Sequence, residues 1–247
     1  MKCARKHAHL HLLLTVALWV GYFGVSKAQA LCFFIARRFD GPALAMLLPT
    51  QNSRAAFLLA GGKSSRMGTD KALIEFRGQT LLARGLHTLA ATCGDVTIVG
   101  HQETLAGHAS VISDIFPGCG PLSGIHTALR HTSAELNLVL AVDMPFVQVG
   151  LLQFLLQTAQ ECDAVATVPQ TARGFQPLCA VYRPGFAAAA ERAIHAGEYK
   201  VDAVFSSISL RVIGDAELLA AGFFERDFFN LNTPEDRKAA ESFPSEG

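Results

Sequence analysis

The chain has 247 residues, 50% of them hydrophobic, and its 21 basic residues balance its 21 acidic ones. This composition excludes a disordered or collagen-like chain, and zero net charge excludes general affinity for nucleic acids or anionic membranes. The balance is uneven along the chain, because residues 1–54 hold seven basic residues and one acidic one, whereas residues 55–247 hold 14 basic and 20 acidic ones. The chain therefore consists of a basic leader (residues 1–54) and an acidic body (residues 55–247).

The leader has the layout of a secretory signal peptide. Basic residues near its start precede an uncharged apolar run over residues 12–25, and small residues follow at 28–30. The run is shorter than the roughly 20 residues that span a bilayer. A second apolar patch at residues 31–35 is followed by two arginines, so an exported or membrane-anchored form stays open as an alternative.

A start site further along the chain explains the leader equally well. Met46 lies nine residues before the first predicted strand and would be a natural start. The six cysteines form no CxxC pair, which predicts reduced thiols, mostly buried, rather than disulfides or a structural zinc site. We therefore expect a cytoplasmic protein with no stable membrane association, in which the leader is not part of the fold. A mature amino terminus at Leu31 would contradict this expectation.

In the body, short apolar runs alternate with longer amphipathic segments. Strands are predicted over residues 55–60, 95–99, 110–113, 137–142, 164–168, 178–182 and 210–213, and helices over residues 79–92, 124–130, 149–160 and 184–195, with a last helix starting at Thr233. This order predicts one α/β domain with a mostly parallel central sheet and helices on both faces. The strand over 137–142 lacks polar alternation, so we expect it to be central and buried on both faces.

The first strand runs into a glycine-rich segment, LAGGKSSRMGTDK, over residues 59–71. Glycines allow the backbone amides to approach phosphate groups closely, and Gly61 and Gly62 begin this segment. Lys63, Arg66 and Lys71 add three cations within nine residues. Neither the P-loop pattern nor the dinucleotide-binding pattern GxGxxG fits. The segment therefore predicts a polyphosphate-binding loop of another kind.

The segment resembles the signature LAGGxSxRMGxDK of nucleotidyltransferases that act on the molybdenum cofactor, and it has every fixed residue of that signature at the same spacing. The family it resembles most is that of the molybdenum cofactor guanylyltransferases, over about residues 56–240. The resemblance implies a three-layer, Rossmann-like nucleotidyltransferase fold, with GTP and molybdopterin as substrates and pyrophosphate as a product. It also implies that Arg66 and Lys71 are catalytic and that the nucleotide contacts the loop at Leu59, Ala60, Gly61, Gly62 and Lys71.

Further segments of the body resemble the same family. Asp114 with the segment GPLSG at residues 120–124 resembles its nucleotide side, where the glycines would allow close approach to base or ribose. Asp143 follows the buried strand, where a carboxylate can bind Mg²⁺ on the nucleotide phosphates, so the resemblance makes it a nucleotide ligand, a metal ligand and catalytic. The acceptor side, for molybdopterin, is implied for Gln176, Asn230 and Asn232.

Three questions stay open at this point. Valine, glycine and histidine stand at residues 99–101 where the family commonly has an asparagine that contacts guanine, so Gly100, His101 or Gln102 would take that role. A cytidylyltransferase for the same cofactor is the alternative within this chemistry, although Gly61 after Ala60 favours guanine. A non-catalytic nucleotide-binding or cofactor-delivery module is the alternative with a different kind of function, which intact Lys71 and Asp143 disfavour.

The resemblance also implies transient contact with molybdoenzymes or their chaperones, to which the product would be delivered.

Overall fold

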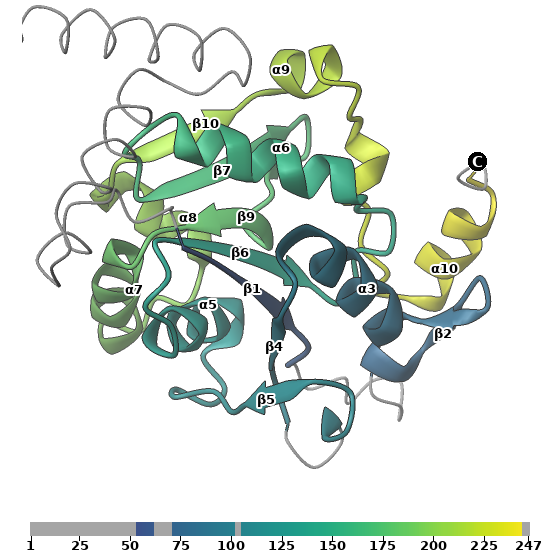
Figure 1. The fold of residues 1–247 in the computed structure, drawn as a ribbon, viewed down its shortest axis with the longest axis horizontal. Helices are drawn as coiled ribbons and strands as arrows, with labels where there is room; N and C mark the ends of the chain where they lie inside the picture. The colour runs from purple at the N-terminus through teal and green to yellow at the C-terminus, as the bar shows by residue number, and fades with distance from the viewer. Residues whose placement is uncertain (1–52, 62–70, 102–104, 244–247) are drawn as a thin grey trace, which may run out of the picture. The chain divides into compact units, whose positions relative to one another are not determined.

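A computed structural model describes residues 53–61, 71–101 and 105–243 of the chain. Its main feature is a central sheet with the strand order β10-β7-β9-β6-β1-β4-β5 and with β8 paired to β7 (Figure 1). The strands are β1 (Arg54–Leu59), β4 (Val96–Val99), β5 (Ser110–Ile112), β6 (Leu136–Ala141), β7 (Ala166–Thr171), β8 (Gly174–Phe175), β9 (Cys179–Tyr182) and β10 (Leu210–Ile213).

Most of the sheet is parallel, as predicted. Strand β1 pairs in parallel with β4 and β6, β4 with β5, and β7 with β10. Strand β9 is the exception among the long strands, because it lies antiparallel between β6 and β7. All six residues of β6 are buried, which confirms the prediction of a central strand covered on both faces.

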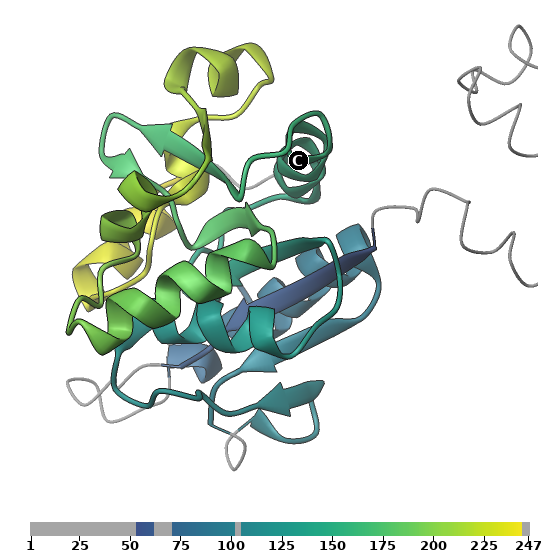
Figure 2. The same ribbon diagram turned by 90° about the vertical axis from the view of Figure 1, so that its left-hand side faces the viewer.

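Helices cover both faces of the sheet (Figures 1 and 2). Two apolar clusters lie on opposite faces, with α3 (Leu81–Cys93) and α6 (Val149–Gln160) contributing to one and α5 (Gly120–Arg130) and α7 (Gly185–His195) to the other. Successive residues of β1 alternate between the clusters, with Leu58 in the first and Phe57 and Leu59 in the second. The three-layer architecture predicted from the sequence is therefore confirmed.

Two glycines allow helices to pack closely on β1 from opposite faces. A Cβ built on Gly85 of α3 would lie 2.8 Å from Leu58 Cδ1, and one built on Gly124 of α5 would lie 3.3 Å from Leu59 Cδ2. A side chain at Gly85 would force Leu58 or the helix to shift, and one at Gly124 would make a tight contact with Leu59. The predicted role of Gly124 in close approach to a ligand is therefore at least partly one of helix packing.

Several short elements complete the described part. A hairpin of β2 (Glu75–Phe76) and β3 (Gln79–Thr80) lies beside the C-terminal helix α10 (Pro234–Glu241) in Figure 1. Thr233 caps α10 by accepting from the amide of Asp236, as its sequence predicts. The remaining elements are η1 (Lys71–Leu73), α8 (Val201–Val204), η2 (Phe205–Ser207), α9 (Asp215–Ala220) and η3 (Glu225–Phe228).

The state of the cysteines and the search for membrane-spanning helices concern only the described residues. Their four cysteines are free thiols, of which Cys179 is buried and Cys93, Cys119 and Cys162 are half-buried, so burial is less general than predicted. Among the residues described, no helix is both long and apolar enough to cross a membrane. Almost all of the leader lies outside these residues, so the predicted division of the chain at Arg54 stays a prediction.

Candidate functional site

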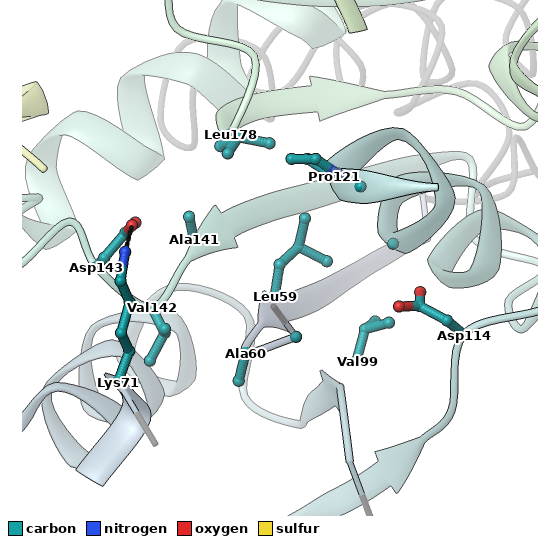
Figure 3. A pocket seen from close by; sticks show the side chains of 13 residues that line it. Leu59, Ala60, Lys71, Val99, Asp114, Pro121, Ala141, Val142, Asp143 and Leu178 are labelled. Atoms are coloured by element: carbon teal, nitrogen blue, oxygen red, sulfur yellow. Dashed lines mark hydrogen bonds and ion pairs between the residues drawn. The ribbon is translucent and has the colours of Figure 1, made fainter. Parts of the chain in front are cut away.

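A pocket lies where parallel strands of the sheet end, as the α/β architecture predicts for a ligand site. The ends of β1 and β6, the segment that follows each of them, the loop after β5 and the start of α5 form its wall. Figure 3 shows Lys71 and Asp143 close together at one end of the pocket, Asp114 at the other, and Leu59 and Ala60 between them. The full lining comprises Leu59, Ala60, Gly61, Lys71, Val99, Asp114, Gly120, Pro121, Gly124, Ala141, Val142, Asp143 and Leu178.

Lys71 forms the centre of the first end. Its ammonium lies 2.7 Å from Asn232 Oδ1 and 3.5 Å from Asp143 Oδ2. Burial raises the pKa of Asp143, and the neighbouring Lys71 ammonium opposes that rise. The backbone carbonyl of Asp143 accepts from the amide of Leu231 at 2.8 Å, so the C-terminal segment is fastened directly to the end of β6. A cation, a carboxylate and an amide thus meet at one point.

Asp114 forms the opposite end of the pocket and is held there by close contacts. Its Oδ1 accepts from Ser123 Oγ at 3.4 Å, and its Oδ2 would lie 3.6 Å from a Cβ built on Gly61. Burial raises the pKa of Asp114, while the hydrogen bond from Ser123 and the charge of His101 act against that rise. The carboxylate therefore lies beside the first glycine of the glycine-rich segment.

Gly100 is one of the residues that could replace the guanine-contacting asparagine common in the family, and the structure limits this role. Its amide donates to the carbonyl of Ile112 at 2.9 Å, so this donor is already used within the sheet. A Cβ on Gly100 would lie 3.2 Å from the backbone of Ala60 and 2.9 Å from Leu105 Cδ1. Gly100 thus serves close packing against the end of β1, and its amide does not replace the asparagine. Gln102 lies outside the described residues, and His101 is exposed.

A second hollow adjoins the first through Asn232. The predicted acceptor residues Gln176, Asn230 and Asn232 all line it, together with Arg173, Phe175, Phe228, Phe229 and Asp236. Gln176 Nε2 donates to Thr171 Oγ1 at 3.2 Å and to the carbonyl of Gly174 at 3.3 Å, which fixes its amide. The hydrogen bond between Lys71 and Asn232 therefore connects the two hollows.

Most of the site residues predicted from the sequence come together in this way. Leu59, Ala60, Gly61, Lys71, Asp114 and Asp143 share one pocket, whereas Gly62, Lys63 and Arg66 lie outside the described residues. Pro121 was predicted only as part of its segment and Leu178 only as part of a strand, and Arg173 was not singled out. The signal that could have found Arg173 is its position next to the predicted acceptor loop, with its guanidinium 5.9 Å from the Phe229 ring centre.

A divalent metal fits this site only together with a ligand that brings its own oxygen atoms. Among the described residues, no group of three or more histidines, cysteines or carboxylates could hold a metal ion. Asp143 is one partly exposed carboxylate at the pocket wall. Mg²⁺ is usually bound by one or two carboxylates plus phosphate oxygens and water, so a nucleotide triphosphate would complete the set. The donor set therefore fits a metal that arrives with a nucleotide, with Asp143 as the protein ligand.

Comparisons with known proteins point to one family. The model of the MobA-like NTP transferase domain matches residues 56–211. A probable molybdenum cofactor guanylyltransferase of Pelotomaculum thermopropionicum is 35% identical over 181 residues, which are 72% of this chain and 87% of the relative. The molybdenum cofactor guanylyltransferase of Desulfosudis oleivorans is 31% identical over 188 residues, 75% of this chain and 93% of the relative.

A solved structure is similar as well. The crystal structure of molybdopterin-guanine dinucleotide biosynthesis protein A from Archaeoglobus fulgidus has a TM-score of 0.67 and 29% sequence identity, and the match covers 76% of this chain and 96% of that one. A 2-C-methyl-D-erythritol 4-phosphate cytidylyltransferase from Thermus thermophilus has a TM-score of 0.54 at 19% identity, which is a likeness of fold alone.

Proposed function

This chain belongs to the family of MobA-like NTP transferase domains, and we propose on that basis that it transfers the GMP unit of GTP to molybdopterin and releases pyrophosphate. The product is the guanine dinucleotide form of the molybdenum cofactor. The observation that carries the proposal is the pocket with a lysine and a carboxylate at one end and a second carboxylate at the other. Such a pocket has separate places for the phosphates and the base of a nucleotide.

The transfer exchanges one phosphoanhydride bond for another. An oxygen of the terminal phosphate of molybdopterin forms a bond to the α-phosphorus of GTP. The bond from that phosphorus to the oxygen that bridges it to the β-phosphate breaks, and its electron pair leaves with pyrophosphate. A phosphomonoester has a second pKa of about 6, so the attacking group is mostly ionised at neutral pH. No protein base is needed, and the protein acts by positioning and by neutralising charge.

The cationic residues carry the phosphate part of this proposal. Lys71 lies at the pocket wall with its ammonium held by Asn232, where it can neutralise charge on the phosphates. Arg66 and the backbone amides of Gly61 and Gly62 are proposed to contact the same phosphates, as the glycine-rich segment predicts. Since Asn232 also lines the acceptor hollow, Lys71 can contact phosphates of both substrates.

Asp143 is the proposed ligand of Mg²⁺, which would enter with GTP. The ion, when bound, supplies charge neutralisation on the phosphates of the nucleotide. Asp143 contributes its carboxylate from the end of β6, and its backbone is fixed by the hydrogen bond from Leu231. Gln176, Asn230 and Asn232 are proposed to bind molybdopterin from the second hollow.

The base end favours guanine over cytosine. Guanine presents its ring N–H and its amino group side by side, and an ionised carboxylate such as Asp114 accepts two parallel hydrogen bonds from such a pair. Cytosine presents one amino group beside a ring nitrogen that is an acceptor, which a carboxylate repels. Asp114 at the pocket wall is therefore proposed to select GTP.

A pyrophosphate-release assay tests the proposed function. We expect release with GTP, Mg²⁺ and molybdopterin together, formation of the dinucleotide by mass spectrometry, and much slower release with CTP. Release of pyrophosphate with CTP but not with GTP would identify a cytidylyltransferase. Tight GTP binding without any release would identify a binding or delivery module, and either result would overturn the proposal.

We also propose a cytoplasmic location and transient contact with the molybdoenzymes, or their chaperones, that receive the product. Both substrates of the proposed reaction are products of intracellular metabolism, and the cysteines of the described part are free thiols, as in a reducing compartment. Fractionation of cells with an antibody against the body of the protein tests the location, and recovery in the membrane or secreted fraction would contradict it.

A further inference from the structure

Helix α5 presents two adjacent stripes of residues to its surroundings. Gly120, Pro121 and Gly124 form one stripe and line the pocket. Ser123 and Thr127, one helical turn apart, form the next stripe and are only 0% and 3% exposed. The second stripe faces the loop that follows β5. Nothing in the proposed chemistry uses these two buried hydroxyl groups.

Helix α5 contacts three consecutive residues of that loop, two of them through the second stripe. Ser123 Oγ donates to Asp114 Oδ1 at 3.4 Å, and the amide of Ile115 donates to Thr127 Oγ1 at 3.0 Å. The ring of Phe116 packs against His126 with ring centres 5.1 Å apart. The loop is thus tied to α5 by one contact to the Asp114 side chain, one to the backbone and one to the next aromatic ring.

The ties matter because the rest of the loop contributes little to fixing Asp114. Residues 113, 115, 117 and 118 are exposed, and no helix or strand is formed between β5 and α5. Without the hydroxyl of Ser123, the carboxylate would lose a hydrogen bond that stabilises its charged form and limits its rotation. Without that of Thr127, the amide of Ile115 would lose its acceptor on α5, and the loop would lose its backbone contact with the helix.

We infer that Ser123 and Thr127 are positioning residues that hold the Asp114 carboxylate toward the nucleotide base and so set both the affinity for GTP and the preference for guanine. The inference rests on the proposed function, because it takes Asp114 as the base contact. It assigns no chemical step to either hydroxyl, since both act through Asp114 and its loop.

The test compares Ser123→Ala and Thr127→Val with the wild-type protein. Loss of one ordinary hydrogen bond corresponds to a factor of about 2 to 10 in an equilibrium constant. We expect each variant to bind GTP more weakly by about that factor in calorimetry, and to discriminate less between GTP and CTP. The kcat at saturating GTP and the KM for molybdopterin should not change. Thr127→Ser keeps the hydroxyl and should restore GTP affinity.

Thr158→Val provides a matched control. Thr158 is a buried threonine of α6 whose hydroxyl donates to the carbonyl of Phe154 at 3.0 Å within its own helix, away from the pocket. This variant should lower the melting temperature about as much as Thr127→Val and leave GTP affinity unchanged. The inference is wrong if Ser123→Ala and Thr127→Val bind GTP like the wild type, or if Thr158→Val weakens GTP binding equally.

Hydrogen exchange of the Ile115 amide separates this inference from the proposed function. Thr127→Val should accelerate exchange at Ile115 well beyond neighbouring amides of α5, whether or not a nucleotide is present. If the wild type did not bind GTP, the proposed function would fail, while unchanged exchange at Ile115 would reject the loop contact itself. The two failures are therefore distinguishable.

Discussion

Lys71 contacts residues from two distant parts of the chain, and the nature of these contacts suits a residue that must bind phosphates. Its nearer partner is the neutral amide of Asn232 at 2.7 Å, and the charged partner, Asp143, is farther away at 3.5 Å. An amide oxygen orients the ammonium without neutralising it. A pair in which both side chains are partly exposed also adds little stability of its own. The positive charge of Lys71 therefore stays available for a polyanion.

Replacing Asp143 tests the phosphate end of the pocket. We expect Asp143→Ala to lower kcat by about 10²- to 10³-fold, because charge stabilisation in the transition state has about that value. The melting temperature should change little, since the ion pair with Lys71 is partly exposed. The exposed Asp163, after α6, provides the control Asp163→Ala. Near-normal transfer by Asp143→Ala in excess Mg²⁺ would show that the metal assignment is wrong.

The acid limb of GTP binding tests Asp114. Burial raises the pKa of this carboxyl, so it should take up a proton at higher pH than an ordinary aspartate. The ionised form accepts from guanine, so affinity is present above the raised pKa and is lost as the pH falls through it. We expect calorimetry to show this loss for the wild type.

Asp114→Asn is the matched control for this titration, because it removes the ionisable group and nearly keeps the shape. It should bind GTP weakly at every pH and lack that part of the pH dependence. Protonation of the GTP phosphates is common to both proteins. Parallel profiles for wild type and variant would therefore exclude Asp114 as the titrating group.

Among the elements, the hairpin of β2 and β3 has a specific role in holding the C-terminal helix. Arg77, in the turn of the hairpin, donates to the carbonyl of Ala240 at 3.1 Å at the end of α10, and its guanidinium lies 5.2 Å and 5.5 Å from the ring centres of Phe76 and Phe146. Cations near the last carbonyl groups of a helix stabilise it. The hairpin thus positions α10, and with it the segment that carries Asn232.

Removing this contact should weaken binding of the acceptor more than binding of the nucleotide. We expect Arg77→Ala to lower the free energy of unfolding by about 1 kcal/mol, since the side chain is exposed and its hydrogen bonds are of ordinary strength. Hydrogen exchange of the last amides of α10 should accelerate and the KM for molybdopterin should rise, with a smaller loss of GTP affinity because Asn232 also holds Lys71. Arg77→Lys keeps the charge but not the forked geometry and should be intermediate. An equal loss of GTP affinity would contradict this role for the hairpin.

The long elements were predictable from the sequence, and the short ones were not. Apolar periodicity gave α6 its bounds and placed the long strands to within a few residues. The hairpin was missed because strands of two residues show no periodicity. The antiparallel direction of β9 was missed because pairing depends on contacts between residues far apart in sequence. For the same reason the motif residues Lys71 and Asp143 were identifiable, whereas the hydrogen bond from Lys71 to Asn232 was not.

At the scale of the whole molecule, the relatives correspond to the body of this chain. The relative from Desulfosudis oleivorans is covered over 93% of its length by 75% of this chain, and the matching family model begins at residue 56. A protein shortened to residues 46–247 should therefore unfold at the same temperature and transfer GMP with the same kcat. The full chain is the control. Loss of activity on shortening, or a native amino terminus at Leu31 by mass spectrometry, would contradict the proposed boundary.

The fastening of the C-terminal segment to β6 has a consequence for synthesis on the ribosome. Lys71 and Asn232 are 161 residues apart, and Leu231 bonds to the carbonyl of Asp143. Most of the pocket wall comes from residues up to Asp143, whereas Asn232, which contacts Lys71, lies in one of the last segments to be translated. Since chains begin to fold from the N-terminal side during synthesis, a nascent chain completes the acceptor side last. Translation thus delays transfer until the protein is nearly finished.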